Sequence, residues 1–125
     1  MDQHLSRSIL LVDDEPLIRV VLSDLLADAG FRVSEVESAD QATEHLQELG
    51  QVDLLITDVR MPGEMDGLAL ARWARKHCPR TKIIIISGYV QSDESRAIGD
   101  FDAYLRKPFV PERLIQVATG LMPTP

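Results

Sequence analysis

Residues 9–16 read Ile9-Leu10-Leu11-Val12-Asp13-Asp14-Glu15-Pro16, so that four apolar residues run directly into three acidic residues and a proline. An unbroken apolar run is typical of a strand that is buried on both faces, as in a parallel sheet covered by helices. Pro16 suits the first position of a helix, where its missing amide hydrogen costs no hydrogen bond. This segment therefore predicts a buried strand that turns at once into a helix.

Four more segments have the pattern of strands. The runs at Leu54–Ile56 and Ile83–Ile86 are continuous and apolar, whereas Arg32–Val36 only alternates and Ala103–Leu105 is short. Together with Ile9–Val12 they predict five strands, of which the continuous runs fit a parallel sheet with both faces covered.

Helical patterns separate these strands. The first helix begins at Pro16 and ends before Gly30, which tolerates the left-handed backbone of a helix end. The second begins after Ser38, which forms a capping-box pattern with Gln41. Apolar residues at helical spacing predict the inward side of the first helix at Ile18, Val21, Leu22, Leu25 and Ala29. Further helices are expected at about 66–77, around Ser92–Ile98, and from Pro111 to about Leu121.

The alternation of strands and helices, with short connections, predicts an α/β fold. Connections between parallel strands are right-handed in nearly all proteins, so the helices should cover both faces of a doubly wound, five-stranded parallel sheet. The length of 125 residues is that of one domain with one core. We expect a single domain over residues 1–125, with an ordered core at about 8–121.

Composition narrows the possible functions. Twenty acidic residues against 13 basic ones give a net charge of -7, which disfavours unspecific attraction to nucleic acid or anionic membranes. The apolar runs are far shorter than the roughly 18 residues that span a bilayer, and no signal-peptide pattern is present. The single cysteine, Cys78, permits no intrachain disulfide and fits a reducing compartment. These features predict a cytoplasmic protein with no direct nucleic-acid or membrane partner.

Polar residues gather where the predicted strands end. Asp13 and Asp14 follow the first strand, Asp58 the third, Ser87 the fourth and Lys107 the fifth. Ligands of a doubly wound sheet bind beyond the carboxyl ends of its strands, so we expect these side chains to meet at one edge. Taken alone, each has an ordinary explanation, such as a helix cap, a turn aspartate, a loop serine or a solvated lysine. Their shared placement favours a site.

A cluster of carboxylates implies a cation, because like charges raise each other's pKa unless a cation enters. Oxygen ligands without histidine or cysteine indicate Mg²⁺, which uses one or two carboxylates and accepts phosphate oxygens. Phosphoryl transfer suits such a site, since there the protein mainly positions groups and neutralises charge. Lys107 and Ser87 would contribute to that neutralisation.

The same motifs resemble a known family. They are Leu11-Val12-Asp13-Asp14-Glu15-Pro16, Thr57-Asp58-Val59-Arg60-Met61-Pro62, Asp66-Gly67, Ser87-Gly88 and Tyr104-Leu105-Arg106-Lys107-Pro108-Phe109. In this order and at nearly this spacing, they resemble the receiver domain of two-component response regulators of the chemotaxis-regulator type. The resemblance covers nearly the whole chain and implies a flavodoxin-like sheet with strand order 2-1-3-4-5.

The resemblance also implies the chemistry of the site. Asp58 would accept a phosphoryl group from the phosphohistidine of a sensor histidine kinase or a phosphotransfer protein. Asp14, Asp58 and the backbone carbonyl of Arg60 would bind Mg²⁺ directly, and Asp13 would hold the ion through water. The protein would then be a signalling phosphoacceptor that catalyses only its own phosphorylation and dephosphorylation, rather than an enzyme.

Further roles follow from the same resemblance. Ser87 and Lys107 would contact phosphoryl oxygens, and the bond between Lys107 and Pro108 would be cis. Tyr104 matches the aromatic switch position, together with Ser87. The output would pass to an unidentified downstream protein through a surface made by residues 92–98, 103–105 and 111–121.

Two segments depart from the family pattern. Residues 61–67 are slightly longer than usual, so the loop over the site is expected to differ. The stretch from Ser87 to Lys107 is slightly shorter, which affects the helix expected around Ser92–Ile98.

Two other functions stay open as alternatives. A phosphatase of the haloacid dehalogenase type also forms an aspartyl phosphate with Mg²⁺, but its pattern has the nucleophile on the first strand and a second Asp two residues later, whereas Asp13 and Asp14 are adjacent. A docking module that is never phosphorylated is disfavoured, because every expected pocket residue is present.

Overall fold

The computed structural model describes residues 7–50, 52–61, 63, 65–88 and 101–122. In chain order the elements are β1 (Ser8–Val12), α1 (Pro16–Asp28), β2 (Arg32–Val36), α2 (Ala39–Leu49), β3 (Leu54–Asp58), α3 (Gly67–His77), β4 (Lys82–Ser87), β5 (Ala103–Arg106) and α5 (Pro111–Leu121). The helix that the sequence predicts around Ser92–Ile98 lies outside the described residues.

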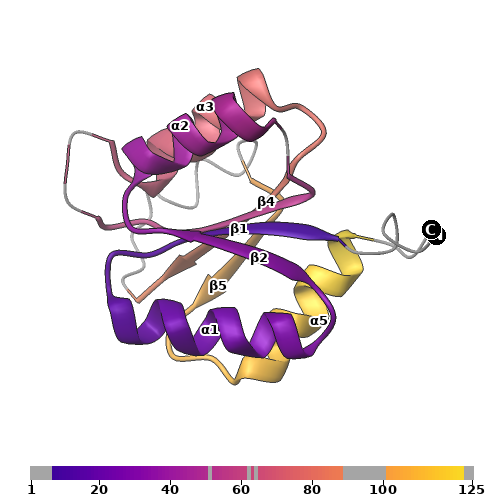
Figure 1. Cartoon of the computed structure of the whole chain (residues 1–125). Coiled ribbons are helices and arrows are strands. Elements are labelled where there is room, and N and C mark those ends of the chain that lie inside the picture. Colours follow the sequence, from indigo (N-terminus) through magenta and orange to yellow (C-terminus); the bar gives the residue numbers. More distant parts are fainter. Residues whose placement is uncertain (1–6, 51, 62, 64, 89–100, 123–125) are drawn as a thin grey trace.

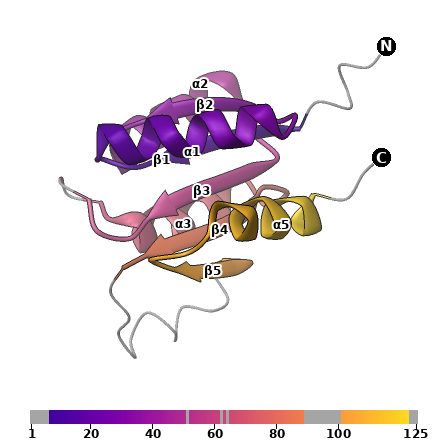
Figure 2. The same cartoon turned by 90° about the horizontal axis from the view of Figure 1, so that it is seen from below.

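The strands form one parallel sheet in the order β2-β1-β3-β4-β5 (Figures 1 and 2; all five strands are labelled in Figure 2). This confirms the predicted α/β class and the strand order 2-1-3-4-5. Nearly every residue of β1, β3 and β4 is buried, as their continuous apolar runs predict. β2 lies at the edge of the sheet and is mostly exposed or half-buried, which explains its weaker pattern.

The helices cover both faces of the sheet. α1 and α5 lie together on one face, and α2 and α3 lie together on the other (Figures 1 and 2). Because successive strand residues point to opposite faces, each strand supplies both cores. The α2 and α3 side buries Leu10, Leu55, Ile83 and Ile85 against Ala42, Leu46, Leu70 and Ala74. The α1 and α5 side buries Ile9, Leu11, Ile56, Ile84 and Ile86 against Leu22, Leu26, Leu114 and Ala118.

The predicted helix boundaries are confirmed with small shifts. The Ser38 hydroxyl accepts a hydrogen bond from the Gln41 amide at 3.1 Å and caps α2. α3 begins at Gly67, because the Asp66 carboxylate caps it by accepting from the Ala69 amide at 2.9 Å. Gly30 follows α1 with a φ of 102°, as a left-handed helix end requires. No helix in the described part of the chain is long and apolar enough to cross a membrane.

The predicted inward side of α1 is partly wrong. Val21 is 54% exposed, and Ala29 is also exposed, whereas Leu22 and Leu26 are buried. The sequence has apolar residues on more than one side of this helix. Which side is buried depends on how α1 packs on the sheet and against α5. Val21 therefore faces solvent next to α5.

β3 and β4 extend beyond their predicted apolar runs. Asp58 pairs with Ile86 and is the last residue of β3, and Ser87 pairs with Arg106 and is the last residue of β4. Polar side chains are tolerated here because the strands end at the edge of the layered core. The extension places Asp58 and Ser87 at the same end of adjacent strands.

Candidate functional site

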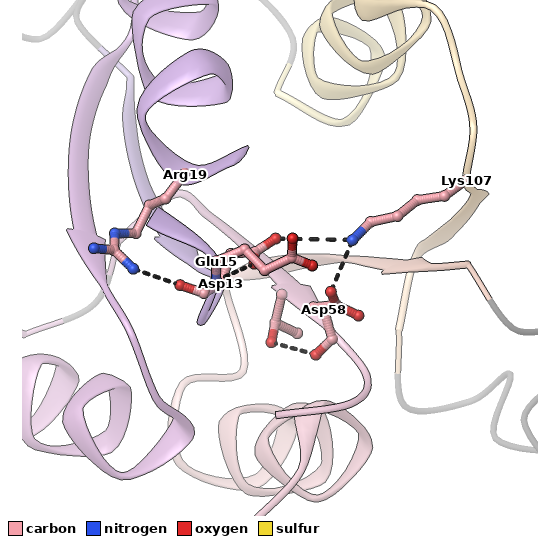
Figure 3. A network of polar contacts seen from close by, with 6 residues as sticks. Asp13, Glu15, Arg19, Asp58 and Lys107 are labelled. Atoms are coloured by element: carbon pink, nitrogen blue, oxygen red, sulfur yellow. Dashed lines mark hydrogen bonds and ion pairs between the residues drawn. The ribbon is translucent and has the colours of Figure 1, made fainter. Parts of the chain in front are cut away.

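The carboxyl ends of β1, β3, β4 and β5 bring polar residues from distant segments together. Asp13 follows β1, Asp58 ends β3, Ser87 ends β4, and Lys107 follows β5. The Lys107 amide donates to the Ser87 carbonyl at 2.8 Å, which holds the ends of β4 and β5 side by side. Figure 3 shows Asp13, Asp58 and Lys107 facing one another at this edge of the sheet.

Three carboxylates form the acidic part of the site. One carboxylate oxygen each of Asp13, Asp14 and Asp58 lies within 4.8 Å of the others. Asp13 is buried and the Asp58 side chain is only 11% exposed, whereas Asp14 is half-buried, so the cluster meets solvent at Asp14. The structure thus brings together the three aspartates that the sequence predicts as neighbours.

Asp13 is held by its main chain and its side chain. Its amide donates to the Val36 carbonyl at 3.3 Å, and its Oδ1 accepts from the Glu15 amide at 2.9 Å. Glu15 is the N-cap residue of α1, which has no side-chain cap hydrogen bond. Neither Asp13 nor Asp14 is thus the N-cap residue of α1, although Asp13 accepts from the amide of that residue.

Lys107, which follows β5, pairs with two carboxylates of the acidic cluster. Its Nζ donates to Asp58 Oδ2 at 2.8 Å and lies 3.9 Å from Asp13 Oδ2. The Lys107 side chain is only 23% exposed, which does not fit a solvated lysine. The bond between Lys107 and Pro108 is cis, as the family resemblance implies.

Burial and charge shift the pKa of two site groups. Burial raises the pKa of Asp13 above its ordinary value of 3.8, although the Glu15 amide and the Lys107 charge act in the opposite direction. Burial lowers the pKa of Lys107, but its hydrogen bond to Asp58 and the charges of Asp58 and Asp13 outweigh that effect, so that the pKa is raised. The carboxylates thus favour an added positive charge beside them.

The remaining predicted residues lie around this centre. Ser87 is 1% exposed at the end of β4, beside the strand that carries Asp58. Arg60 is exposed two residues beyond Asp58. Tyr104 is half-buried on β5, where its ring lies 6.0 Å from the Phe101 ring, centroid to centroid.

Sequence reasoning gave no role to Gly67, although the motif includes it. Its amide donates to the Val59 carbonyl at 2.8 Å, and a Cβ at this position would lie 1.9 Å from the Asp58 carbonyl oxygen. Only glycine fits here without a shift of the backbone that carries Asp58. The position directly after the cap residue Asp66 gives no sequence signal for this close approach.

The donor set fits a hard divalent cation. Mg²⁺ prefers oxygen ligands at about 2.0–2.1 Å, so opposite ligands of one ion lie roughly 4 Å apart. Carboxylate oxygens within 4.8 Å of one another reach that geometry with small side-chain movements or through a bridging water. The half-buried Asp14 leaves solvent access for water ligands on that side.

Comparison with known proteins identifies close relatives. A family model described as the response regulator receiver domain matches residues 9–119. The transcriptional regulatory protein GltR of Pseudomonas aeruginosa is 42% identical over 120 residues, which cover 93% of this chain and 49% of GltR. The sensor kinase CckA of Brucella abortus is 41% identical over 118 residues, covering 91% of this chain and 12% of the kinase. The chain spans about half or less of these curated relatives.

Solved structures share the fold over almost their full length. A CheY-like response regulator receiver domain protein from Methanospirillum hungatei JF-1 aligns with a TM-score of 0.86 and 27% identity, covering 93% of this chain and 94% of that one. The response regulator TrrA from Thermotoga maritima, solved in complex with Mg(2+)-BeF, aligns with a TM-score of 0.85 and 32% identity, covering 93% and 99%. Since the family model spans most of the chain and the sheet order agrees, the chain belongs to the receiver domain family of two-component response regulators.

Proposed function

We propose that this chain is the phosphoacceptor of a two-component or phosphorelay system and that Asp58 is the residue phosphorylated. The observation that carries the proposal is the contact of 2.8 Å between Lys107 Nζ and Asp58 Oδ2 within a cluster of three carboxylates. The donor would be the phosphohistidine of a sensor histidine kinase or phosphotransfer protein. The relatives GltR, a transcriptional regulatory protein, and CckA, a sensor kinase, support this proposal.

The chain's own residues would act as follows. An oxygen of Asp58 attacks phosphorus, the bond between phosphorus and the donor imidazole nitrogen breaks, and the imidazole keeps the electron pair and takes a proton from solvent. Lys107 already contacts Asp58 and would follow the charge onto a phosphoryl oxygen. Ser87, buried at the end of the neighbouring strand, would contact a second phosphoryl oxygen.

Asp14, Asp58 and the Arg60 carbonyl would hold Mg²⁺, and Asp13 would hold it through water. When bound, the ion would neutralise the carboxylates and the oxygens of the transferred group.

Asp14→Ala removes one direct ligand, so we expect weaker Mg²⁺ binding in a calorimetric titration. A variant that binds Mg²⁺ as tightly as the parent contradicts this ligand role.

The alternative phosphatase finds no support in the site. Its pattern needs a second Asp two residues after a nucleophile on the first strand, whereas Glu15 stands two residues after Asp13 and takes part in the N-terminus of α1. The reactive position supported by the geometry is Asp58 on β3, which contacts the lysine.

The test is phosphorylation by a small acyl phosphate with Mg²⁺, followed by intact-mass measurement. We expect one phosphoryl group on the parent, none on Asp58→Asn, and a parent-like result for Asp24→Asn, a control at an exposed aspartate on α1. Undiminished phosphorylation of Asp58→Asn would overturn the assignment.

The donor protein would dock on an apolar groove between α1 and the segment 107–111 that leads from β5 into α5. The groove has a volume of about 420 Å³ and is lined by Leu17, Val21, Leu25, Pro108 and Phe109, with the site residue Lys107 at its border. Leu17 is 82% exposed, which is unusual for a large apolar side chain without a partner. Because Lys107 belongs to both groove and site, a helix seated here would bring its phosphohistidine next to Asp58.

Two neighbouring valines test this docking surface. Val21 is 54% exposed and lines the groove, whereas Val20 is 50% exposed on the same helix and does not line it. We expect Val21→Ser to slow phosphoryl transfer from a kinase that phosphorylates the parent, and Val20→Ser to leave it unchanged. The rate with the small acyl phosphate should be the same for both variants. Equal kinase rates for the two variants would place the donor elsewhere.

Tyr104 and Ser87 would transmit the phosphorylated state to the surface formed by residues 92–98, β5 and α5. Tyr104 lies on β5, is half-buried and packs against the core on the α2 and α3 side. Its ring would therefore respond to a movement of the neighbouring end of β4. The part of this surface at 92–98 lies outside the described residues. A downstream protein would recognise this surface.

A further inference from the structure

Arg19 joins three segments around the acidic cluster. It lies on α1, where its Nη1 donates to the Asp13 carbonyl at 2.7 Å (Figure 3). Its Nε lies 3.3 Å from Glu35 Oε1 on β2. The Arg19 side chain is 17% exposed, whereas the Glu35 side chain is 35% exposed, so the ion pair borders solvent. One guanidinium thus connects α1, the turn after β1 and the edge strand.

The same turn is also bound to β2 directly. The Asp13 amide donates to the Val36 carbonyl at 3.3 Å, next to Glu35 in the strand. Both main-chain polar groups of Asp13 are therefore tied, the amide to β2 and the carbonyl to Arg19. The fixed fork of a guanidinium suits this arrangement, because its nitrogens can serve two acceptors at a set angle.

We propose that Arg19, oriented by Glu35, is a positioning residue for the metal site. By fixing the main chain of Asp13, it sets the direction in which the side chains of Asp13 and Asp14 enter the acidic cluster. This inference rests on the proposed function and adds to it a residue that touches neither the cation nor the phosphoryl group. Partners that orient metal ligands commonly change metal affinity by about 10- to 100-fold when they are removed.

The sign of the effect separates positioning from simple charge. Arg19 carries a positive charge near a site for a divalent cation, so its removal would strengthen Mg²⁺ binding if charge alone mattered. If Arg19 positions the carboxylates, its removal weakens binding despite that electrostatic gain. Glu35→Gln keeps the shape of the side chain but weakens its hold on Arg19, and it should lower the affinity in the same direction.

The experiment compares Mg²⁺ affinity by isothermal titration calorimetry. We expect Arg19→Gln to weaken binding by roughly tenfold. The control Arg72→Gln makes the same change of charge at an exposed position on α3 and should match the parent. Glu35→Gln should weaken binding less, and the double variant Arg19→Gln with Glu35→Gln should be no weaker than Arg19→Gln alone, because both act through one contact.

A second measurement, amide hydrogen exchange, tests the stability of the turn after β1 in the absence of metal. Amide hydrogen exchange at residues 13–15 should be faster in Arg19→Gln than in the parent and unchanged in Arg72→Gln, since a freed turn opens more often. If Arg19→Gln fails to fold, as judged by circular dichroism, amide exchange at residues 13–15 in Glu35→Gln decides in its place: faster exchange than in the parent supports the inference and unchanged exchange overturns it. The Glu35→Gln titration does not decide alone, because loss of the Glu35 charge would by itself weaken Mg²⁺ binding.

Two results overturn the inference. One is Mg²⁺ binding by Arg19→Gln that is as tight as in the parent or tighter. The other is unchanged exchange at residues 13–15 in that variant. Absence of Mg²⁺ binding in the parent is a different outcome, because it rejects the proposed function itself.

Discussion

At Asp13, burial of a carboxylate opposes folding, although the same residue belongs to the acidic cluster. Its carboxylate is buried, its pKa is raised by that burial, and two further aspartates stand beside it. A group with a raised pKa adds stability only while it is protonated, so the ionised form opposes folding of the metal-free protein. Under the proposed function, this charge would be offset by Mg²⁺, which Asp13 would hold through water.

Asp13→Asn should therefore stabilise the metal-free protein at neutral pH. The folded pKa of Asp13 lies above the unfolded value of 3.8, so its contribution is present below pH 3.8 and is lost as the pH rises through the folded pKa. Urea unfolding with a chelator should show the variant to be more stable than the parent at pH 7. At pH 3 the difference should shrink, since the parent is then protonated in both states. A gain that grows toward low pH contradicts this account.

Gly67→Ala should damage the site that it borders. The new Cβ would lie 1.9 Å from the Asp58 carbonyl oxygen, and the necessary backbone shift should cost about 1–3 kcal/mol of unfolding free energy and slow phosphorylation of Asp58. Gly120→Ala is the matched control, because no atom lies within 4 Å of its added Cβ on α5. There we expect a gain of roughly 0.5–1 kcal/mol from helix propensity. Chemical denaturation and the acyl phosphate reaction measure both effects.

Among the elements, β5 depends on Asp102 for its attachment. Asp102 Oδ2 accepts from the Ile83 amide at 2.8 Å and from Arg75 of α3 at 3.0 Å. The Asp102 amide also donates to the Ile83 carbonyl at 2.8 Å. One residue thus aligns the start of β5 with β4 and fastens both to α3.

Asp102→Ala should lower the unfolding free energy by about 1–3 kcal/mol, because it leaves the Ile83 amide without this acceptor. Asp102→Asn keeps an acceptor oxygen and should lose less. Urea denaturation of the two variants compares them directly. Equal losses would mean that the Arg75 charge pair, rather than the hydrogen bond to Ile83, carries the stabilisation.

Taken as a whole, the molecule assembles its site at one end of the sheet from segments far apart in the chain. Lys107 and Asp58, in contact at 2.8 Å, are separated by 49 positions. β5 lies next to β4 at the sheet edge, carries Tyr104 and is followed directly by Lys107. If Asp58 is phosphorylated as proposed, a change there would reach the outer surface through this strand. Under the proposed function, the output and the phosphorylation chemistry would therefore both depend on β5.

Tyr104→Ala should separate phosphorylation of Asp58 from the response of the surface formed by β5 and α5. Phosphorylation of Asp58 by a small acyl phosphate should remain, while the change in amide hydrogen exchange of β5 and α5 that follows phosphorylation in the parent should be lost. In the parent we expect a coupling of about 1–3 kcal/mol between phosphorylation and binding of a downstream protein. From sequence alone we also expect residues 92–98 to respond. An unchanged exchange pattern across β5 and α5 in the phosphorylated parent would place the output elsewhere.

Local sequence signals predict much of this protein. Strands and helix starts are predicted within one or two residues, because their signals act through neighbours in the chain. The run Ile83–Ile86 predicts β4, and Pro16, Pro111 and the Ser38 cap predict the starts of α1, α5 and α2. The order of these elements also predicts that Asp13, Asp58 and Lys107 meet, since parallel strands end at one edge. The sequence-predicted acidic cluster is thus present in the fold.

Other features depend on contacts between distant residues, and no local pattern encodes them. Leu26 rather than Val21 is buried because α1 is seated beside α5, and the Asp58 carbonyl excludes a side chain at Gly67 because α3 begins against the end of β3. Arg19 looks like a surface residue in the sequence, yet the fold turns it between Glu35 and the Asp13 carbonyl. Local patterns specify which elements form and where they end, whereas burial, pKa and the partners of each side chain arise only when those elements pack.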